Sequence, residues 1–301
     1  MWFECIAFVC IGYIIYHVIH LYFNQHKLIF YPTHNGEDFP TLDYIKEHSH
    51  LPFDLKEVKI TTDDNNTVYL YACLQQNPEI HTTILLFQSN AGSVLDRLRL
   101  AANYYKLCDV NFCIAVYRGF DKATGIPTEQ YMTQDCERYF DALQSLNIDM
   151  NKVVVLGRSI GVSMALKLFN KRKCYGLIIE NGFTSLYGMA IKFFPFLKSL
   201  SFVVKDKWDN LEEIQRVNAG SKILMFSSGS DEMVSPEMMG QLYLKAKENG
   251  RLVRFESFSE GNHMNLPEYP RYFVIVTKYL EDLEKSDECF DCGTFENCLN
   301  E

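Results

Sequence analysis

The stretch "VVVLGRSIGVSMALKLF", Val153 to Phe169, places a single serine between two glycines. Its first residues are mostly β-branched and apolar without polar alternation, which predicts a strand buried on both faces of a sheet. From Ile160 onward the residues are mostly helix formers with no second breaker before Asn170, which predicts a helix packed on that sheet. The stretch therefore predicts a strand, a tight turn and a helix.

The turn reads Gly157-Arg158-Ser159-Ile160-Gly161, which is the G-x-S-x-G pattern of a nucleophile elbow. Small flanking residues let the strand and the helix approach each other around a strained serine. Ser159 is therefore a candidate nucleophile, with Gly157 and Gly161 as elbow glycines. A buried strand–helix junction whose serine caps the helix fits the same short pattern.

A serine hydroxyl becomes a useful nucleophile when a base accepts its proton and a carboxylate orients that base. In folds built around such an elbow, both partners follow the serine in the chain. Of the eight histidines, His263 alone follows Ser159. It lies in a glycine-containing loop after a strand-like run, residues 252–258. His263 is therefore the candidate base.

The candidate acid is Asp231, which lies in a Ser/Gly turn after the strand-like residues 222–226. The helix expected next is opened by Ser235 and Pro236, a favourable pair for a helix start. Glu180, at the end of the strand-like "GLIIE", is the reserve acid. As a strand-end residue it could equally be a structural hydrogen-bond partner.

The chain resembles the α/β-hydrolases, and more closely the small membrane-anchored, ABHD-like serine hydrolases of the bud-emergence type. The resemblance covers nearly everything after Leu55 and rests on motifs in the family order. These motifs are "LLFQSNAGSVLDRL" (85–98), "VYRGFDKATGIPTEQ" (116–130), "LGRSIG" (156–161), "IIENGFTSL" (178–186), "SSGSDEMVSPEMM" (227–239) and "GNHMN" (261–265). It implies an α/β-hydrolase fold with a mostly parallel eight-stranded sheet, helices on both faces and a short cap after the sixth strand.

The resemblance also implies an oxyanion hole made by the backbone amides of Asn90 and Ile160. Relatives usually carry His-Gly-Asn-Ala-Gly where this chain has Gln88-Ser89-Asn90-Ala91-Gly92. If the second position needs a positive φ, Ser89 strains the backbone and misdirects the Asn90 amide. If φ there is negative, the Ser89 hydroxyl is expected to cap the helix that follows.

Eight strands are expected near residues 55–61, 67–73, 82–87, 112–116, 153–157, 176–180, 222–227 and 252–258. Helical segments between most of them predict a mostly parallel sheet. The polar turn "TTDDNNT" between the first two strands predicts an antiparallel start. A length of 301 residues and a hydrophobic content of 48% suit one hydrolase domain, expected over residues 51–285.

The N-terminal run "CIAFVCIGYIIYHVIHLYF", residues 5–23, contains no Lys, Arg, Asp or Glu. It approaches the roughly 20 residues that an apolar helix needs to span a bilayer. We therefore expect a transmembrane anchor over residues 1–24, a connecting segment over 25–50, single-pass membrane localisation and the lipid bilayer as a partner. A buried N-terminal helix is the alternative. Lys27 favours a cytosolic hydrolase and the sequon Asn65-Asn66-Thr67 a lumenal one.

The C-terminal residues 286–301 form a Cys-containing acidic tail with thiols at Cys289, Cys292 and Cys298. Three thiols without a nearby histidine fall short of the four ligands of a zinc site, and a disulfide or S-acylation fits them as well as metal does. No metal or cofactor is expected. The net charge of −9 disfavours nucleic acid as a partner.

The function expected from these residues is a serine hydrolase that forms an acyl-enzyme from an ester or thioester. The segment 184–210, placed like a cap, is rich in apolar residues that suit an acyl chain: Phe193, Phe194, Phe196, Leu197 and Phe202. Because some relatives remove acyl groups from cysteines, the preferred substrate is a lipid-type thioester of a lipidated protein, followed by a lipid ester. A serine peptidase of the same fold and a catalytically weak membrane scaffold remain as alternatives.

Overall fold

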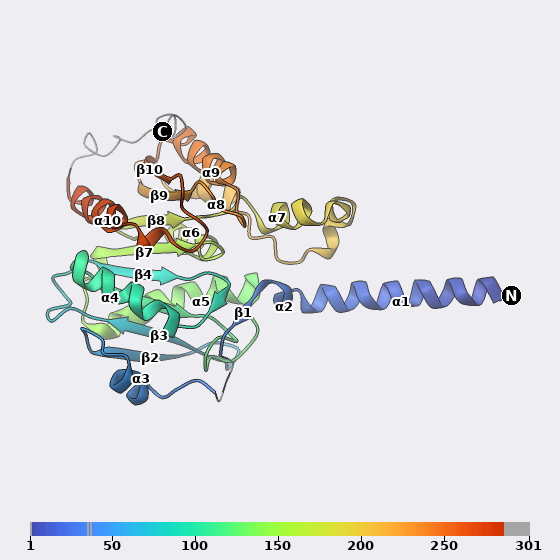
Figure 1. Cartoon of the computed structure of the whole chain (residues 1–301), viewed down its shortest axis with the longest axis horizontal. Coiled ribbons are helices and arrows are strands. Elements are labelled where there is room, and N and C mark those ends of the chain that lie inside the picture. The colour runs from blue at the N-terminus through green and yellow to red at the C-terminus, as the bar shows by residue number, and fades with distance from the viewer. Residues whose placement is uncertain (1, 35, 37, 286–301) are drawn as a thin grey trace.

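The structure is a computed structural model that describes residues 2–34, 36 and 38–285 (Figure 1). The predicted cysteine-containing tail, 286–301, lies outside the described residues.

The fold is built on an eight-stranded sheet with the strand order β10-β9-β8-β7-β4-β6-β3-β2. The strands are β2 (Leu55–Thr61), β3 (Thr67–Cys73), β4 (Thr83–Phe87), β6 (Asn111–Val116), β7 (Val153–Arg158), β8 (Gly176–Glu180), β9 (Lys222–Ser228) and β10 (Leu252–Phe258). β3 pairs antiparallel with both β2 and β6, and every other pair in this sheet is parallel. The predicted eight strands and their mostly parallel arrangement are therefore confirmed, with ends that differ by at most one residue.

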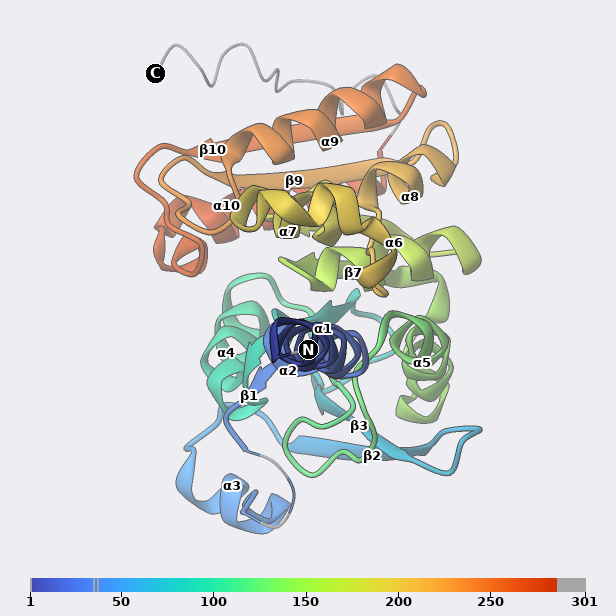
Figure 2. The same ribbon diagram turned by 90° about the vertical axis from the view of Figure 1, so that its right-hand side faces the viewer.

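Helices cover both faces of the sheet. Strands β4, β6, β7 and β8 are therefore buried along their whole length. One face carries α4 (Leu98–Leu107) and α10 (Pro270–Leu283), which contact each other. The other face carries, in contact order, α5 (Glu129–Ala142), α6 (Gly161–Lys171), α8 (Asn210–Arg216) and α9 (Pro236–Glu248). Figure 2 shows these two layers on either side of the strands.

The remaining elements lie outside this three-layer body. They are α1 (Trp2–Asn24), α2 (His26–Ile29), β1 (Tyr31–Pro32), α3 (Leu42–His48), β5 (Ala91–Gly92), α7 (Leu186–Phe193) and the 3₁₀ turns Leu95–Arg97, Leu143–Leu146, Met150–Lys152, Pro195–Val203 and Leu266–Glu268. α7 and the turn after it occupy the place predicted for the cap, following β8. α1 projects from the body on the same side as α7 (Figure 1).

The transmembrane helix predicted for residues 1–24 is not found. Across the described residues, no helix is both long and apolar enough to cross a membrane. α1 carries His17 and His20 among its apolar residues, and imidazoles are costly to place in hydrocarbon. The alternative of a helix buried in the core is also wrong, because Val9 and Phe23 in α1 are 72% and 69% exposed.

A short strand that the sequence did not predict joins the N-terminal segment to the loop after β4. β1 pairs parallel with β5. The Tyr31 amide donates to the Asn90 carbonyl at 2.8 Å, and the Thr33 amide donates to the Gly92 carbonyl at 3.1 Å. The side-chain amide of Asn90 donates to the Ile29 carbonyl at 2.6 Å.

The same segment also contacts the cap. Gln25 donates from Nε2 to the Val203 carbonyl at 2.5 Å and accepts from the Lys205 amide at 3.0 Å. We refer to residues 25–33 as the N-terminal strap, because they connect the cap to the loop after β4.

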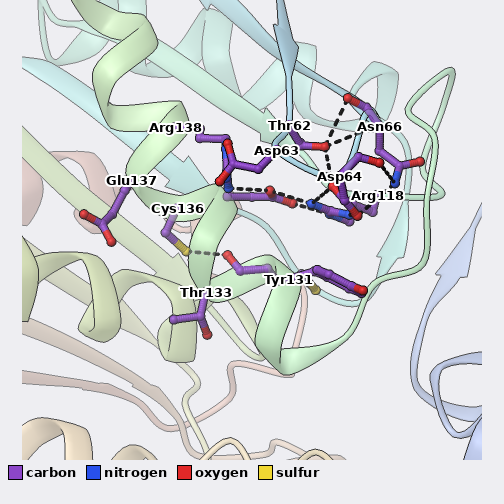
Figure 3. A network of polar contacts seen from close by, with 12 residues as sticks. Thr62, Asp63, Asp64, Asn66, Arg118, Tyr131, Thr133, Cys136, Glu137 and Arg138 are labelled. Atoms are coloured by element: carbon purple, nitrogen blue, oxygen red, sulfur yellow. Dashed lines mark hydrogen bonds and ion pairs between the residues drawn. The ribbon is translucent and has the colours of Figure 1, made fainter.

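Arg118 ties the β2–β3 hairpin to α5 (Figure 3). Its buried guanidinium makes two hydrogen bonds to Asp135, at 2.6 and 3.0 Å, and two to Asp64, at 2.6 and 3.0 Å. The Tyr131 ring lies 4.5 Å from its carbon Cζ. Asp64 accepts a further bond from the Thr62 hydroxyl at 2.6 Å. These paired charges hold the sheet edge to the helix layer.

Candidate active site

The candidate site forms where the parallel strands end. The carboxyl ends of β4, β7, β8, β9 and β10 meet at one edge of the sheet, because these strands are parallel neighbours. The residues that follow these ends include Asn90, Ser159, Asn181, Asp231 and His263. Ligand and catalytic sites in open α/β sheets lie at this edge.

Ser159 sits in a strained elbow. Its φ is 55°, in the left-handed region that non-glycine residues rarely adopt. A side chain at Gly157 would lie 2.6 Å from both the Gly161 carbonyl oxygen and the Val162 Cα, and one at Gly161 would overlap the Phe87 carbonyl. Only glycine at both positions lets β7, α6 and the end of β4 pack this closely.

The alternative role of Ser159 as a helix cap is not seen, because no side-chain hydrogen bond caps the start of α6. The serine is held instead through its backbone, whose amide donates to the Glu180 carbonyl at 2.9 Å. Its side chain stays available for chemistry.

His263 and Asp231 form a buried pair. The distance from His263 Nδ1 to Asp231 Oδ2 is 2.7 Å, and each side chain is 2% exposed. Asp231 Oδ1 accepts from the Met233 and Val234 amides at 2.9 and 2.8 Å, which fixes the carboxylate. With Nδ1 donating to a carboxylate, Nε2 of the neutral ring is the proton acceptor.

Nε2 of His263 is buried and has no hydrogen-bond partner among the described residues. No hydrogen bond therefore joins it to Ser159 in this structure, and catalytic hydrogen bonds often tighten only when substrate binds. The structure brings Asp231, and not the reserve acid Glu180, to the imidazole. Burial raises the pKa of the Glu180 carboxyl, with Arg158 and His263 opposing that shift.

The segment that carries His263 is fixed by groups from three strand ends. Arg158, the residue before the serine, donates from Nη2 to the His263 carbonyl at 3.3 Å. Asn181 donates to the same carbonyl at 3.2 Å, and the Ser228 hydroxyl donates to the Asn262 carbonyl at 2.7 Å. The imidazole position is therefore coupled to the elbow itself.

Asn181 and Ser228 were not predicted from the sequence. They form a reciprocal pair, with Asn181 Nδ2 donating to Ser228 Oγ and the Ser228 amide donating to Asn181 Oδ1, both at 2.9 Å. A signal was present, since a polar residue directly follows predicted strand 176–180 and another ends the strand beginning at Lys222.

The two amides expected to form the oxyanion hole are free. Within the described part of the chain, neither the Asn90 amide nor the Ile160 amide donates a hydrogen bond. The loop that carries Asn90 is held at its start, because the Tyr117 hydroxyl donates to the Gln88 carbonyl at 2.6 Å. An oxyanion hole requires unpaired backbone donors, so the absence of partners for these two amides is compatible with that prediction.

The expectation that Ser89 strains the backbone is wrong. Ser89 is not among the residues with positive φ, whereas Gly92 in the same loop has a φ of 96°. The Ser89 hydroxyl does not cap a helix either. It accepts a hydrogen bond from Arg97 Nη2 at 3.2 Å. Ser89 therefore fits this loop without penalty, and the left-handed turn falls three residues later.

The apolar side chains of the cap differ in their exposure. Phe194 and Phe202 are 54% and 74% exposed, while Leu197 is buried. The side chains of the other two apolar residues singled out, Phe193 and Phe196, lie outside what the structure describes.

Comparison with known proteins agrees with this architecture. A family model described as "Alpha/beta hydrolase of unknown function (DUF1057)" matches residues 53–217. The protein bem46 of Schizosaccharomyces pombe is 30% identical over 87% of both chains. An uncharacterized membrane protein of Saccharomyces cerevisiae is 26% identical over 86% of this chain and 90% of its own length.

Among solved structures, the esterase Pf2001 of Pyrococcus furiosus superposes with a TM-score of 0.62 at 17% identity, over 83% of this chain and 98% of the esterase. At that identity the likeness concerns the fold. The sheet order, the elbow and the family match lead to one conclusion: the chain belongs to the α/β-hydrolase family.

Proposed function

We propose that the protein is a serine hydrolase that cleaves acyl esters or thioesters through an acyl-enzyme. The observation that carries this proposal is the buried Asp231–His263 pair with an unpartnered Nε2, linked through Arg158 to a serine in a strained elbow. A nucleophile, an oriented base and free amide donors at one sheet edge are the parts that acyl transfer requires.

In the first half of the reaction, the Ser159 oxygen attacks the acyl carbonyl carbon while His263 Nε2 accepts the hydroxyl proton. The carbonyl oxygen becomes an oxyanion that accepts hydrogen bonds from the amides of Ile160 and Asn90. Asp231 stabilises the imidazolium that forms. Collapse of this intermediate breaks the bond to the leaving oxygen or sulfur, which takes the proton from His263.

In the second half, His263 accepts a proton from water as the water oxygen attacks the acyl-enzyme. The bond to the Ser159 oxygen then breaks, and the serine regains its proton from His263 as the carboxylic acid leaves. No metal or cofactor takes part in these steps.

The preferred substrate is an ester or thioester with an apolar acyl chain. Phe194 and Phe202 present exposed rings on the cap, and apolar side chains of this kind suit an acyl chain. The esterase Pf2001 of Pyrococcus furiosus has the same fold. A lipid-type thioester, such as an acylated cysteine, stays the first substrate to test, and a lipid ester the second.

The test is labelling by a fluorophosphonate probe, which reacts with activated serines. Wild-type protein is expected to be labelled, and Ser159→Ala protein is expected not to be. Ser163→Ala is the matched control, since this buried hydroxyl lies one turn later in α6 and has no hydrogen-bond partner among the residues that the structure describes. Absence of labelling in folded wild-type protein, or equal labelling of Ser159→Ala, would contradict the proposal and favour a catalytically weak scaffold.

A further inference from the structure

A cavity of about 670 Å³ lies beside the loops that carry the candidate catalytic residues, between the start of α4 and the segment after His263. Ser159 and His263 do not line it. Its charged lining comes from Asp96, Arg97, Arg99, Arg158 and Glu268. A volume of this size is many times the share of one water in liquid, about 30 Å³, so it could hold a small organic ligand.

Two of the lining arginines are buried, with Arg97 8% exposed and Arg158 5% exposed. In the described structure, no carboxylate lies within 4.0 Å of either guanidinium, and the Nε of each is buried without a hydrogen-bond partner. Buried charges are normally paired, because an unpaired one costs several kcal/mol of desolvation. Neither guanidinium therefore has a carboxylate in direct contact, and Asp96 and Glu180 act on them only from a longer distance.

Glu180 compensates these charges incompletely. It is buried, and burial raises its pKa, so it holds a proton more readily than an exposed glutamate. Burial and the neighbouring charge of Arg158 both lower the pKa of Arg97, and the charges of Asp96 and Glu180 oppose that shift only in part. Asp96 directs one oxygen to the Ser93 amide at 2.8 Å. An added anion would relieve this imbalance.

Each buried arginine also holds one of the two loops of the candidate site. Arg97 Nη2 donates to the Ala91 carbonyl at 2.9 Å and to the Ser89 hydroxyl at 3.2 Å. Arg158 Nη2 donates to the carbonyls of His263, at 3.3 Å, and of Met264. A group bound between the two guanidiniums would therefore contact the anchors of the oxyanion loop and of the histidine loop together.

We propose that this cavity binds a phosphate group, free or carried by a small phosphorylated molecule, between Arg97 and Arg158. Arginine is the side chain best suited to this ligand, because its planar fork matches the oxygens of a phosphate. The carboxylates of Asp96 and Glu268 disfavour an anion near them, so the phosphate lies at the inner end, between the two buried guanidiniums. The site is distinct from the serine and is independent of the proposed hydrolysis.

The test measures the melting temperature and the dissociation constant of the full chain with inorganic phosphate and, separately, with glycerol 3-phosphate. Chloride keeps the ionic strength constant. We expect a saturable rise in melting temperature, as for any ligand that binds the folded state alone. A stronger response to glycerol 3-phosphate identifies a phosphorylated molecule as the source, and an equal response identifies free phosphate.

Arg97→Gln and Arg158→Gln are each expected to weaken phosphate binding by about tenfold or more, the value of one charge-assisted hydrogen bond. Lys245→Gln on α9, far from the cavity lining, is the matched control and should bind like the wild type. Ser159→Ala should also bind normally, which separates this result from the fate of the proposed hydrolysis.

If a glutamine variant fails to fold, as judged by circular dichroism, Arg97→Lys and Arg158→Lys take its place. They keep the charge but lose the fork, and each is expected to bind several-fold more weakly. The proposal is overturned if wild-type protein shows no saturable response to either probe. It is also overturned if folded variants at both arginines bind phosphate as tightly as the wild type.

Discussion

The buried arginine Arg118 and the buried arginines Arg97 and Arg158 differ in their hydrogen-bond partners. Arg118 makes four hydrogen bonds to the carboxylates of Asp64 and Asp135 (Figure 3). Within residues 2–34, 36 and 38–285, Arg97 and Arg158 bond only to carbonyls and one hydroxyl, and they hold the loops of the candidate site. Among the described residues, Arg118 has carboxylates in direct contact, whereas Arg97 and Arg158 do not.

The difference teaches how burial should be interpreted. A buried cation with two carboxylates has its desolvation cost offset on the spot, so it serves to hold elements together. A buried cation without a carboxylate in contact destabilises the fold. Proteins often retain such unfavourable charges at sites where ligands bind. Substitutions in the two regions should therefore change different measurements.

The largest expected effect lies in the loop that Arg158 holds. His263→Ala should lower kcat on a short p-nitrophenyl ester by about 10⁴-fold to 10⁶-fold, because the serine loses its proton acceptor. The melting temperature should change little by comparison. His48→Ala, on the exposed side of α3, is the control and should keep full activity. A folded His263→Ala protein with a near wild-type rate would rule out the triad.

The next largest effect is expected around Arg118, in the free energy of unfolding. Arg118→Ala should lower the free energy of unfolding by about 3–5 kcal/mol. It leaves the buried Asp135 carboxylate with Arg138, 3.3 Å away, as its remaining ion-pair partner among the described residues. Lys46→Ala, which removes an exposed ion pair with Asp54, should cost no more than about 1 kcal/mol. Urea unfolding measures both, and kcat per folded molecule should stay constant. Loss of activity without loss of stability in Arg118→Ala would contradict the prediction that Arg118 serves stability alone.

A smaller effect is expected from pH in the same region. Hydrogen bonds from Arg118 and then from Thr62 hold the pKa of Asp64 well below its usual range. The unfolded chain therefore takes up a proton near pH 4 while the folded chain does not, so stability is present above that pH and declines as the pH falls. Asp64→Asn should flatten this decline in acid unfolding curves. Superimposable pH profiles would show that Asp64 contributes nothing.

The smallest effect is expected at Ser89. Ser89→Ala removes the acceptor of one Arg97 hydrogen bond and should cost about 0.5–1.5 kcal/mol of stability, with kcat unchanged. Ser89→Gly should behave in the same way, since Ser89 has no positive φ to relieve. Thermal melts and ester kinetics on the same three proteins decide this. A higher kcat in Ser89→Gly would restore the view that serine strains the oxyanion loop.

The sequence predicted most of the sheet because buried parallel strands are continuous apolar runs. It also predicted which acid would meet His263, since Asp231 lies in a turn that directly follows a strand. The elbow strain followed from the glycines around Ser159, and the structure shows the expected positive φ. The strands and the elbow depend on residues that are neighbours in the chain, and the Asp231–His263 pair depends on two loops that each follow a strand of the same parallel sheet.

What the sequence missed depends on contacts between distant residues. The β1–β5 pair has two residues in each strand, too few for any periodic pattern. Whether Ser89 needed a positive φ was decided by how the loop packs on Arg97 and Tyr117. The N-terminal run contains no Lys, Arg, Asp or Glu and predicted a membrane span, because His17 and His20 were expected to weaken that span only slightly.

The N-terminal strap has a consequence for the order of folding. Its bond between Ile29 and Asn90 closes a separation of 61 residues, and that between Gln25 and Val203 closes 178. Closing the longer loop costs only about 1 kcal/mol more in chain entropy, since each doubling adds about 0.6 kcal/mol. Such non-local contacts form slowly, however, whereas the elbow assembles from adjacent residues. During refolding, the oxyanion loop should therefore reach its final geometry after the elbow, and recovery of esterase activity should lag behind recovery of the folded core.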